Sequence, residues 1–66
     1  MHVWINGEQR ELAAGASVLD AMTVLGAPGS GVAVAVDGEV VPRAAWPGTE
    51  LRDGARVEVL TAVQGG

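Results

Sequence analysis

Two dipeptides, Asn6-Gly7 and Asp37-Gly38, constrain the fold of this chain more than any other feature. Each of them separates two short runs of strand-forming residues. Asn-Gly and Asp-Gly favour the type I′ turn, which needs positive φ at both central residues and joins two antiparallel strands. The chain is therefore expected to contain two β-hairpins. Because it has only 66 residues, these hairpins account for a large part of a single small domain.

One helix is expected between the two hairpins. Ser17 followed three residues later by Asp20 is typical of a helix N-terminus, and Gly26 is typical of the residue that ends a helix. The helix is therefore predicted over residues 18–25, with one apolar stripe. Strands are predicted at residues 3–5, 8–12, 32–36, 39–41 and 56–63.

This order of elements predicts an α+β fold. A helix with one apolar stripe packs on one face of a sheet, which gives two layers. The order β-β-α-β-β-β is that of a ubiquitin-like β-grasp with a mixed sheet of about five strands. By analogy with that fold, we expect the first and last strands to be parallel neighbours at the sheet centre. Pro42 cannot donate a hydrogen bond to a neighbouring strand, so the strand before it is expected at an edge.

Charge and composition exclude several classes of function. The net charge is −4, and this disfavours nucleic-acid binding, which depends on clustered positive charge. The chain has no cysteine, and the single His2 cannot form a metal site alone. We find no catalytic constellation, no signal peptide and no apolar stretch long enough to span a membrane. The sequence predicts a cytoplasmic protein that is not an enzyme and binds no metal.

The candidate functional site is the end of the sequence, Val63-Gln64-Gly65-Gly66. Glycine has no β-carbon and loses much entropy on ordering, so Gly65 and Gly66 are poor candidates for a stabilising role. They provide a slim main chain ending in a carboxylate, which a narrow enzyme channel can admit. Four extended residues reach about 14 Å. We therefore expect a domain over residues 1–62 and a flexible tail over residues 63–66. The alternative is that the glycines are only a frayed chain end.

Three short motifs resemble the ThiS family, the small sulfur carriers of thiamine biosynthesis. They are Val41-Pro42-Arg43 followed by Trp46, then Asp53-Gly54 before a valine-rich strand, and the terminal Val63-Gln64-Gly65-Gly66. The resemblance covers essentially the whole chain.

The resemblance implies a carrier rather than an enzyme. A ThiF-like adenylating enzyme would use ATP to activate the Gly66 carboxylate, and a sulfur donor enzyme would supply the sulfur of a thiocarboxylate. A ThiG-like thiazole synthase would then accept that sulfur. The carrier itself would bind no cofactor. Two alternatives stay open: a sulfur carrier for molybdopterin or amino-acid biosynthesis, and a non-covalent β-grasp interaction module.

Strand alternation predicts a partner-binding surface. On the first strand, Val3 and Ile5 face one side and Trp4 the other. Trp4, Leu60 and Ala62 are then expected on the sheet face away from the helix, with Ala33 and Ala35 nearby. An exposed apolar patch with an aromatic residue is typical of a partner site. The alternative is that loops cover part of it.

Three further residues have expected roles that are mainly structural. Trp46 is predicted to pack in the core and His2 to lie on the surface of a strand. Arg43 is interpreted as a loop cation with a structural role, with steering of a partner as the alternative.

Overall fold

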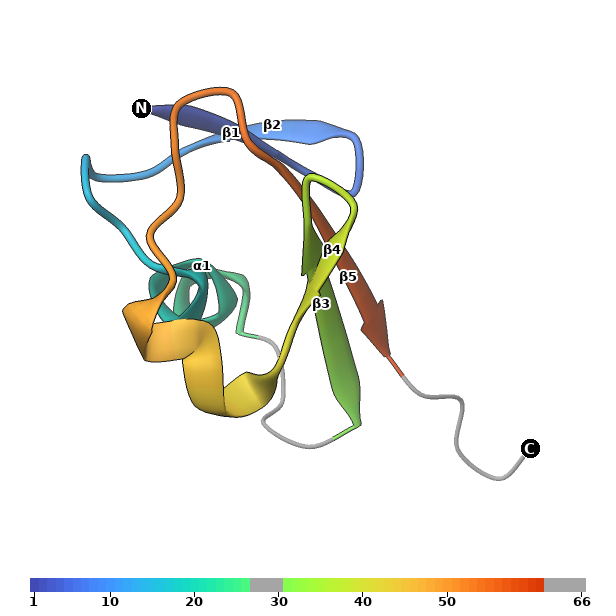
Figure 1. The fold of residues 1–66 in the computed structure, drawn as a ribbon. Helices are drawn as coiled ribbons and strands as arrows, with labels where there is room; N and C mark the ends of the chain where they lie inside the picture. The colour runs from blue at the N-terminus through green and yellow to red at the C-terminus, as the bar shows by residue number, and fades with distance from the viewer. Residues whose placement is uncertain (27–30, 62–66) are drawn as a thin grey trace.

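A computed structural model describes residues 1–26 and 31–61, which form one mixed sheet with a helix on one face (Figure 1). In chain order the elements are β1 (His2–Ile5), β2 (Glu8–Glu11), α1 (Val18–Leu25), β3 (Val32–Val36), β4 (Glu39–Val41), the 3₁₀ helix η1 (Arg43–Gly48) and β5 (Arg56–Thr61). The order of strands in the sheet is β2-β1-β5-β3-β4. The predicted α+β architecture and its order of elements are confirmed.

Both predicted hairpin turns are present. The φ angles are 52° at Asn6 and 84° at Gly7 in the first turn, and 50° at Asp37 and 87° at Gly38 in the second. These angles lie in the left-handed region, which Asn, Asp and Gly tolerate better than other residues. The turns join β1 to β2 and β3 to β4 as antiparallel pairs.

The strand β5 lies at the centre of the sheet between the two hairpins. It runs parallel to β1, with Ile5 opposite Val57, and antiparallel to β3. The first and last strands are therefore parallel neighbours, as predicted. The strand β4 lies at one edge, as expected from Pro42. The residues after Thr61 therefore follow the central strand of the sheet in sequence.

Local sequence signals set the two ends of α1. The Ser17 hydroxyl accepts a hydrogen bond from the Asp20 N–H at 3.1 Å, and an Asp20 carboxylate oxygen accepts one from the Ser17 N–H at 2.9 Å. This reciprocal capping box satisfies donors that the first helical turn leaves free. Gly26 ends the helix in the left-handed conformation, with φ 68°. The helix therefore has the predicted bounds.

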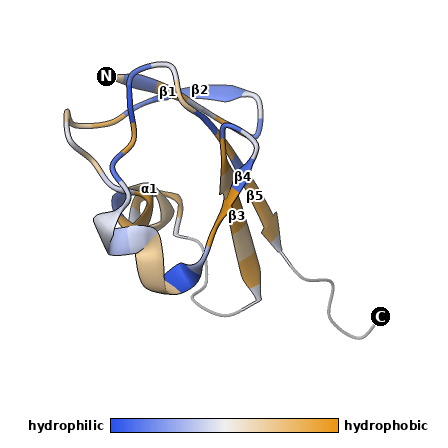
Figure 2. Ribbon diagram, in the orientation of Figure 1, coloured by the Kyte–Doolittle hydropathy of each residue, from blue (hydrophilic) through white to orange (hydrophobic). Residues whose placement is uncertain are grey.

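The core lies between the sheet and the two helical segments. Figure 1 shows α1 and η1 side by side on one face of the sheet, and Figure 2 shows that β3 and the end of β5 are hydrophobic while the edge strand β2 is hydrophilic. The largest fully buried side chains are Val3, Val18, Val34 and Val57. On β1, Val3 and Ile5 are buried while His2 and Trp4 are exposed, which confirms the predicted alternation.

Two strand ends differ from the prediction. The strand β1 begins at His2, one residue before the predicted start. The strand β2 ends at Glu11, one residue earlier than predicted, and Leu12 turns into the core. The strand β5 is described as far as Thr61, and its predicted extension to residue 63 stays a prediction. Residues 62 and 63 lie outside the described part of the chain.

Candidate functional site

The strand β5 leads to the predicted functional residues. The candidates that follow Thr61 lie outside the described residues: Ala62, Val63, Gln64, Gly65 and Gly66. The reactive role of Gly66 and the division into residues 1–62 and 63–66 therefore stay predictions. The structure describes the strand that precedes these residues, the contacts that hold it, and the surface around its end.

Asn6 holds the C-terminal half of β5. Its side-chain Nδ2 donates a hydrogen bond to the Val59 carbonyl oxygen at 3.2 Å, and its Oδ1 accepts one from the Val59 N–H at 2.8 Å. Its main-chain N–H donates to the Val57 carbonyl oxygen at 2.9 Å. The sequence predicted Asn6 only as a turn residue, so this contact to β5 is new.

Asp37 holds the other end of β5 in a similar way. Its Oδ1 accepts a hydrogen bond from the Arg56 N–H at 3.0 Å, and its own N–H donates to the Arg56 carbonyl oxygen at 2.8 Å. Asp37 and Asn6 are the first residues of the two hairpin turns. Both turns therefore bind the main chain of β5, one at its start and one near its end.

Apolar side chains gather on the sheet face away from α1. Leu60 is 68% exposed and lies opposite Ala33, and Val40 is 75% exposed and lies opposite Ala35. We call these four residues the apolar patch. Where β5 ends, a shallow hollow of about 310 Å³ is lined by Gly31, Val32, Ala33, Leu60 and Thr61. The patch therefore lies next to the point where the chain continues toward its last residues.

Val40 is the member of the apolar patch that sequence reasoning missed. Val41, the next residue, is partly buried against the core, so strand alternation places Val40 on the opposite face. The sequence signal for an exposed Val40 was the pair Val40-Val41 after the Asp37-Gly38 turn, because only one of two successive strand residues can face the core. A strand of three residues is too short for that alternation to be evident.

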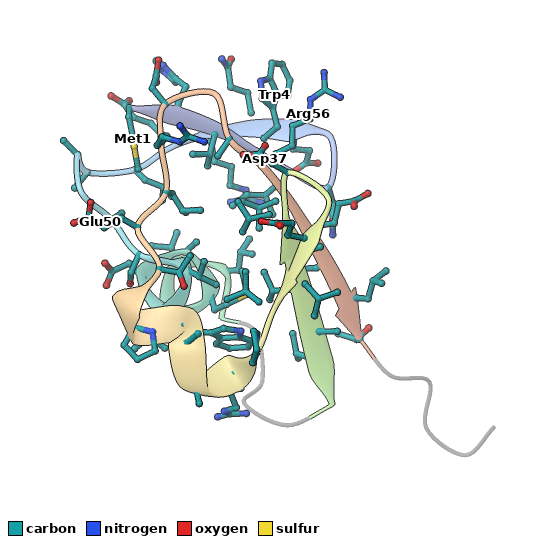
Figure 3. All side chains as sticks on the ribbon, viewed as in Figure 1. Met1, Trp4, Asp37, Glu50 and Arg56 are labelled. Atoms are coloured by element: carbon teal, nitrogen blue, oxygen red, sulfur yellow. The ribbon has the colours of Figure 1, made fainter. Side chains whose placement is uncertain are left out.

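Trp4 lies on the same sheet face as Leu60 but at the other end of β5. It is 42% exposed and sits opposite Arg56, and Figure 3 shows these two side chains next to each other. Arg56 and Leu60 are four residues apart, or about 13 Å along a strand. Glu58, which is exposed, lies between them on this face. The structure thus places Trp4 and Leu60 on the expected face, separated by a charged residue.

The Val41-Pro42-Arg43 motif and Trp46 form a structural unit. Trp46 is buried, and its ring N–H donates a hydrogen bond to the Val41 carbonyl oxygen at 3.0 Å. The Arg43 guanidinium lies over the ring, 5.5 Å from its centroid. The predicted core position of Trp46 is confirmed. The contact with Trp46 gives Arg43 a structural role, because it packs against the ring that holds η1 to β4.

The titratable side chains of the described residues form no metal-binding group. Within residues 1–26 and 31–61, no three His, Asp or Glu side chains lie close enough together to hold a metal ion. In the same part of the chain, every buried side-chain nitrogen and oxygen has a hydrogen-bond partner. Neither helical segment described is long and apolar enough to cross a membrane. That the chain binds no metal and no cofactor stays a prediction.

The sheet order, the parallel pair β1 and β5 at its centre, and the single α-helix on one face define a protein of the ubiquitin-like β-grasp class. Comparison with known families is more specific. The model of the ThiS family matches residues 3–66, so the chain belongs to the ThiS family. The predicted resemblance is confirmed.

Individual relatives cover the chain almost completely. The sulfur carrier protein ThiS of Thermus thermophilus is 39% identical over 64 residues, which span 97% of this chain and 98% of that protein. The crystal structure of the thiamine biosynthesis protein ThiS from Geobacter metallireducens has a TM-score of 0.84 at 30% identity, with 100% of both chains covered. A solution structure of a thiamine biosynthesis protein from the same organism has a TM-score of 0.80 at 32% identity and covers 100% of this chain and 88% of that one.

Proposed function

We propose that this chain is a sulfur carrier protein of thiamine biosynthesis and that the Gly66 carboxylate is the group that carries the sulfur. The observation that carries the proposal is the match to the ThiS family over residues 3–66, which includes the terminal Gly65-Gly66. The fold adds support, because the central strand β5 precedes the proposed reactive end directly in sequence.

The first step of the proposed chemistry activates Gly66. A carboxylate is a poor electrophile until one oxygen becomes part of a good leaving group. A ThiF-like adenylating enzyme transfers AMP from ATP to the Gly66 carboxylate, which forms an acyl adenylate and releases pyrophosphate. The carrier supplies no catalytic side chain to this step. ATP is a substrate of the partner enzyme.

The second step exchanges AMP for sulfur. The terminal sulfur of a persulfide on a donor enzyme attacks the Gly66 carbonyl carbon, and AMP leaves. A thiol then reduces the resulting acyl disulfide, which releases the Gly66 thiocarboxylate and leaves a disulfide on the donor side. The thiocarboxylate sulfur is a stronger nucleophile than a carboxylate oxygen, and a ThiG-like thiazole synthase accepts it during thiazole formation. We place this chemistry in the cytoplasm.

The tail also has a steric requirement. Side chains at the last two positions would crowd a narrow channel and hinder attack at the terminal carbonyl, and Gly65 and Gly66 have none. Val63 and Gln64 add reach, since four extended residues span about 14 Å. The folded domain then docks outside the partner while Gly66 enters its active site.

The docking surface for the adenylating enzyme is proposed to be the sheet face that carries the apolar patch, with Trp4 and Ala62 contributing to it. Leu60 is only three residues before Val63, so a partner that holds residues 63–66 in its channel must also face this end of β5. The exposure of Leu60 and Val40 supports this surface, because burial of large apolar side chains drives most protein association.

A growth experiment tests the pathway. A bacterial strain that lacks its own carrier and requires thiamine receives this chain together with the adenylating enzyme and thiazole synthase of the source organism. Growth without thiamine is expected with the intact chain and not with a variant that lacks Gly66. Growth that depends on added thiamine despite accumulation of the intact chain would contradict the thiamine assignment. Growth supported by the Gly66 deletion would contradict the role of the terminal carboxylate.

A further inference from the structure

The end of β5 pairs with β3 on one edge, and on its other edge it is bound by one side chain from a distant part of the sequence, that of Asn6. We propose that Asn6 is a positioning residue: by binding Val59 on the edge that β3 leaves open, it fixes the end of β5, from which the chain continues in sequence toward Gly66. This inference rests on the proposed function, because it assumes that Gly66 must reach the active site of a partner enzyme.

The strand β1 supports only the beginning of β5. The two strands pair at Trp4 with Arg56 and at Ile5 with Val57, and the chain then turns away at Asn6-Gly7. The strand β5 continues from Glu58 to Thr61. Over these residues the described chain offers β3 as the neighbouring strand on one side and no strand on the other. The last part of β5 is therefore paired along one edge only.

The Asn6 side chain occupies this open edge. A primary amide carries a donor and an acceptor, as a peptide group does. Asn6 uses both on one residue, donating to the Val59 carbonyl oxygen and accepting from the Val59 N–H. Its side chain thus replaces the next residue of β1 and extends the support of β5 by two positions. A type I′ turn needs only the backbone conformation of Asn6, so this contact goes beyond what the turn requires.

The positive φ of Asn6 allows the side chain to be tested apart from the turn. Glycine and aspartate also tolerate φ 52°. Asn6→Gly removes both hydrogen bonds to Val59. Asn6→Asp keeps an acceptor for the Val59 N–H, but it loses the donor and brings a carboxylate next to the Val59 carbonyl oxygen.

The other hairpin supplies a matched control. Asp37 has nearly the same φ, 50°, and its Oδ1 accepts a hydrogen bond from the Arg56 N–H. Asp37→Gly therefore removes a side-chain contact of the same kind from the same strand. Arg56 is the first residue of β5, so this loss lies at the end remote from the tail. Both variants lose a turn side chain and its hydrogen bonding to β5, but only Asn6→Gly leaves the end that precedes Gly66 bound by β3 alone.

The test measures adenylation of the carrier by a ThiF-like enzyme that accepts the wild-type chain. Pyrophosphate release is followed while the carrier concentration is varied, after circular dichroism has verified that each variant is folded at the assay temperature. Asn6→Gly is expected to raise KM about tenfold, because one or two residues held only by β3 are less ordered and must be ordered again on binding, and to leave kcat within about twofold. Asp37→Gly is expected to leave both constants unchanged. Asn6→Asp is expected to lie between the wild type and Asn6→Gly.

Two results would overturn the inference. Equal KM values for Asn6→Gly and the wild type would mean that Asn6 does not position the tail. Equal increases for Asn6→Gly and Asp37→Gly would mean that general loss of stability explains the effect. If Asn6→Gly does not fold, Asn6→Asp, which keeps the turn and one hydrogen bond, decides the question in the same assay. Failure of the wild-type chain to be adenylated would contradict the proposed function itself and this inference with it.

Discussion

Leu60 on the central strand lies opposite Ala33 on β3, and both side chains are exposed on the sheet face that α1 leaves uncovered. Opposite residues in a strand pair present their side chains to the same face and pack against each other. This pair lies at the end of β5 from which the chain continues toward Gly66. The proposed docking surface therefore lies at the strand end that precedes the proposed reactive group in sequence.

Leu60→Glu is expected to weaken binding to the adenylating enzyme about tenfold or more, since burial of a leucine side chain contributes about 1.5–3 kcal/mol. Folding should change by less than about 1 kcal/mol, because Leu60 is largely exposed. Trp4→Glu should weaken binding in the same direction. Isothermal titration calorimetry with the enzyme measures the dissociation constants.

Val24→Glu is the matched control for these substitutions. Val24 is a 62% exposed apolar residue on α1, which covers the opposite face of the sheet. Its replacement is expected to leave the dissociation constant unchanged. Wild-type affinity in Leu60→Glu, or an equal loss in Val24→Glu, would show that the partner binds elsewhere.

Trp46 is expected to act on stability rather than on sulfur transfer. Trp46→Phe removes the hydrogen bond to the Val41 carbonyl oxygen and part of the ring, which should lower the free energy of unfolding by about 1–3 kcal/mol. Arg43→Ala should lower it by about 0.5–1 kcal/mol through loss of the contact with the ring. Urea denaturation followed by circular dichroism measures both changes. A Trp46→Phe variant of unchanged stability that no longer accepts sulfur would assign this motif to partner recognition instead.

Gly54 and Gly48 should respond in opposite ways to replacement by alanine. A β-carbon added at either position meets no atom within 4 Å, so neither substitution creates a clash. Gly54 has φ 83°, where alanine is strained by about 1–2 kcal/mol. Gly48 lies outside this φ region, and Gly48→Ala should be neutral or stabilise the fold by up to about 1 kcal/mol. Melting temperatures of the two variants test this difference. Equal losses at the two positions would contradict the role assigned to positive φ.

Local signals in the sequence were sufficient for the elements themselves. Ser17, Asp20 and Gly26 predicted both ends of α1 because a capping box and a C-terminal glycine act within one helical turn. Asn6-Gly7 and Asp37-Gly38 predicted the hairpins for the same reason, since φ at two residues determines the turn. Alternation along β1 then predicted that the Trp4 side chain lies on the sheet face opposite to that of Val3 and Ile5.

Relationships across the sheet could not be predicted in the same way. Asn6 and Val59 are 53 positions apart, and their contact depends on the register of β1 against β5, which no local pattern determines. The register also sets the spacing between Trp4 and Leu60. Alternation could place both on one face but could not show that Glu58 separates them. The role of Gly66 came from the family motif, because a glycine offers no side chain from which chemistry could be inferred.

Whether Gly66 carries sulfur is tested by the intact mass of the chain after incubation with ATP, a ThiF-like adenylating enzyme, a persulfide donor and a thiol. A ThiS protein already established as a carrier serves as the positive control, and a variant with one residue added after Gly66 as the negative control. We expect that the chain gains the mass difference between sulfur and oxygen, that fragmentation locates this gain at Gly66, and that the extended variant gains nothing. An unchanged mass under conditions in which the positive control is converted would show that this chain does not carry sulfur at Gly66.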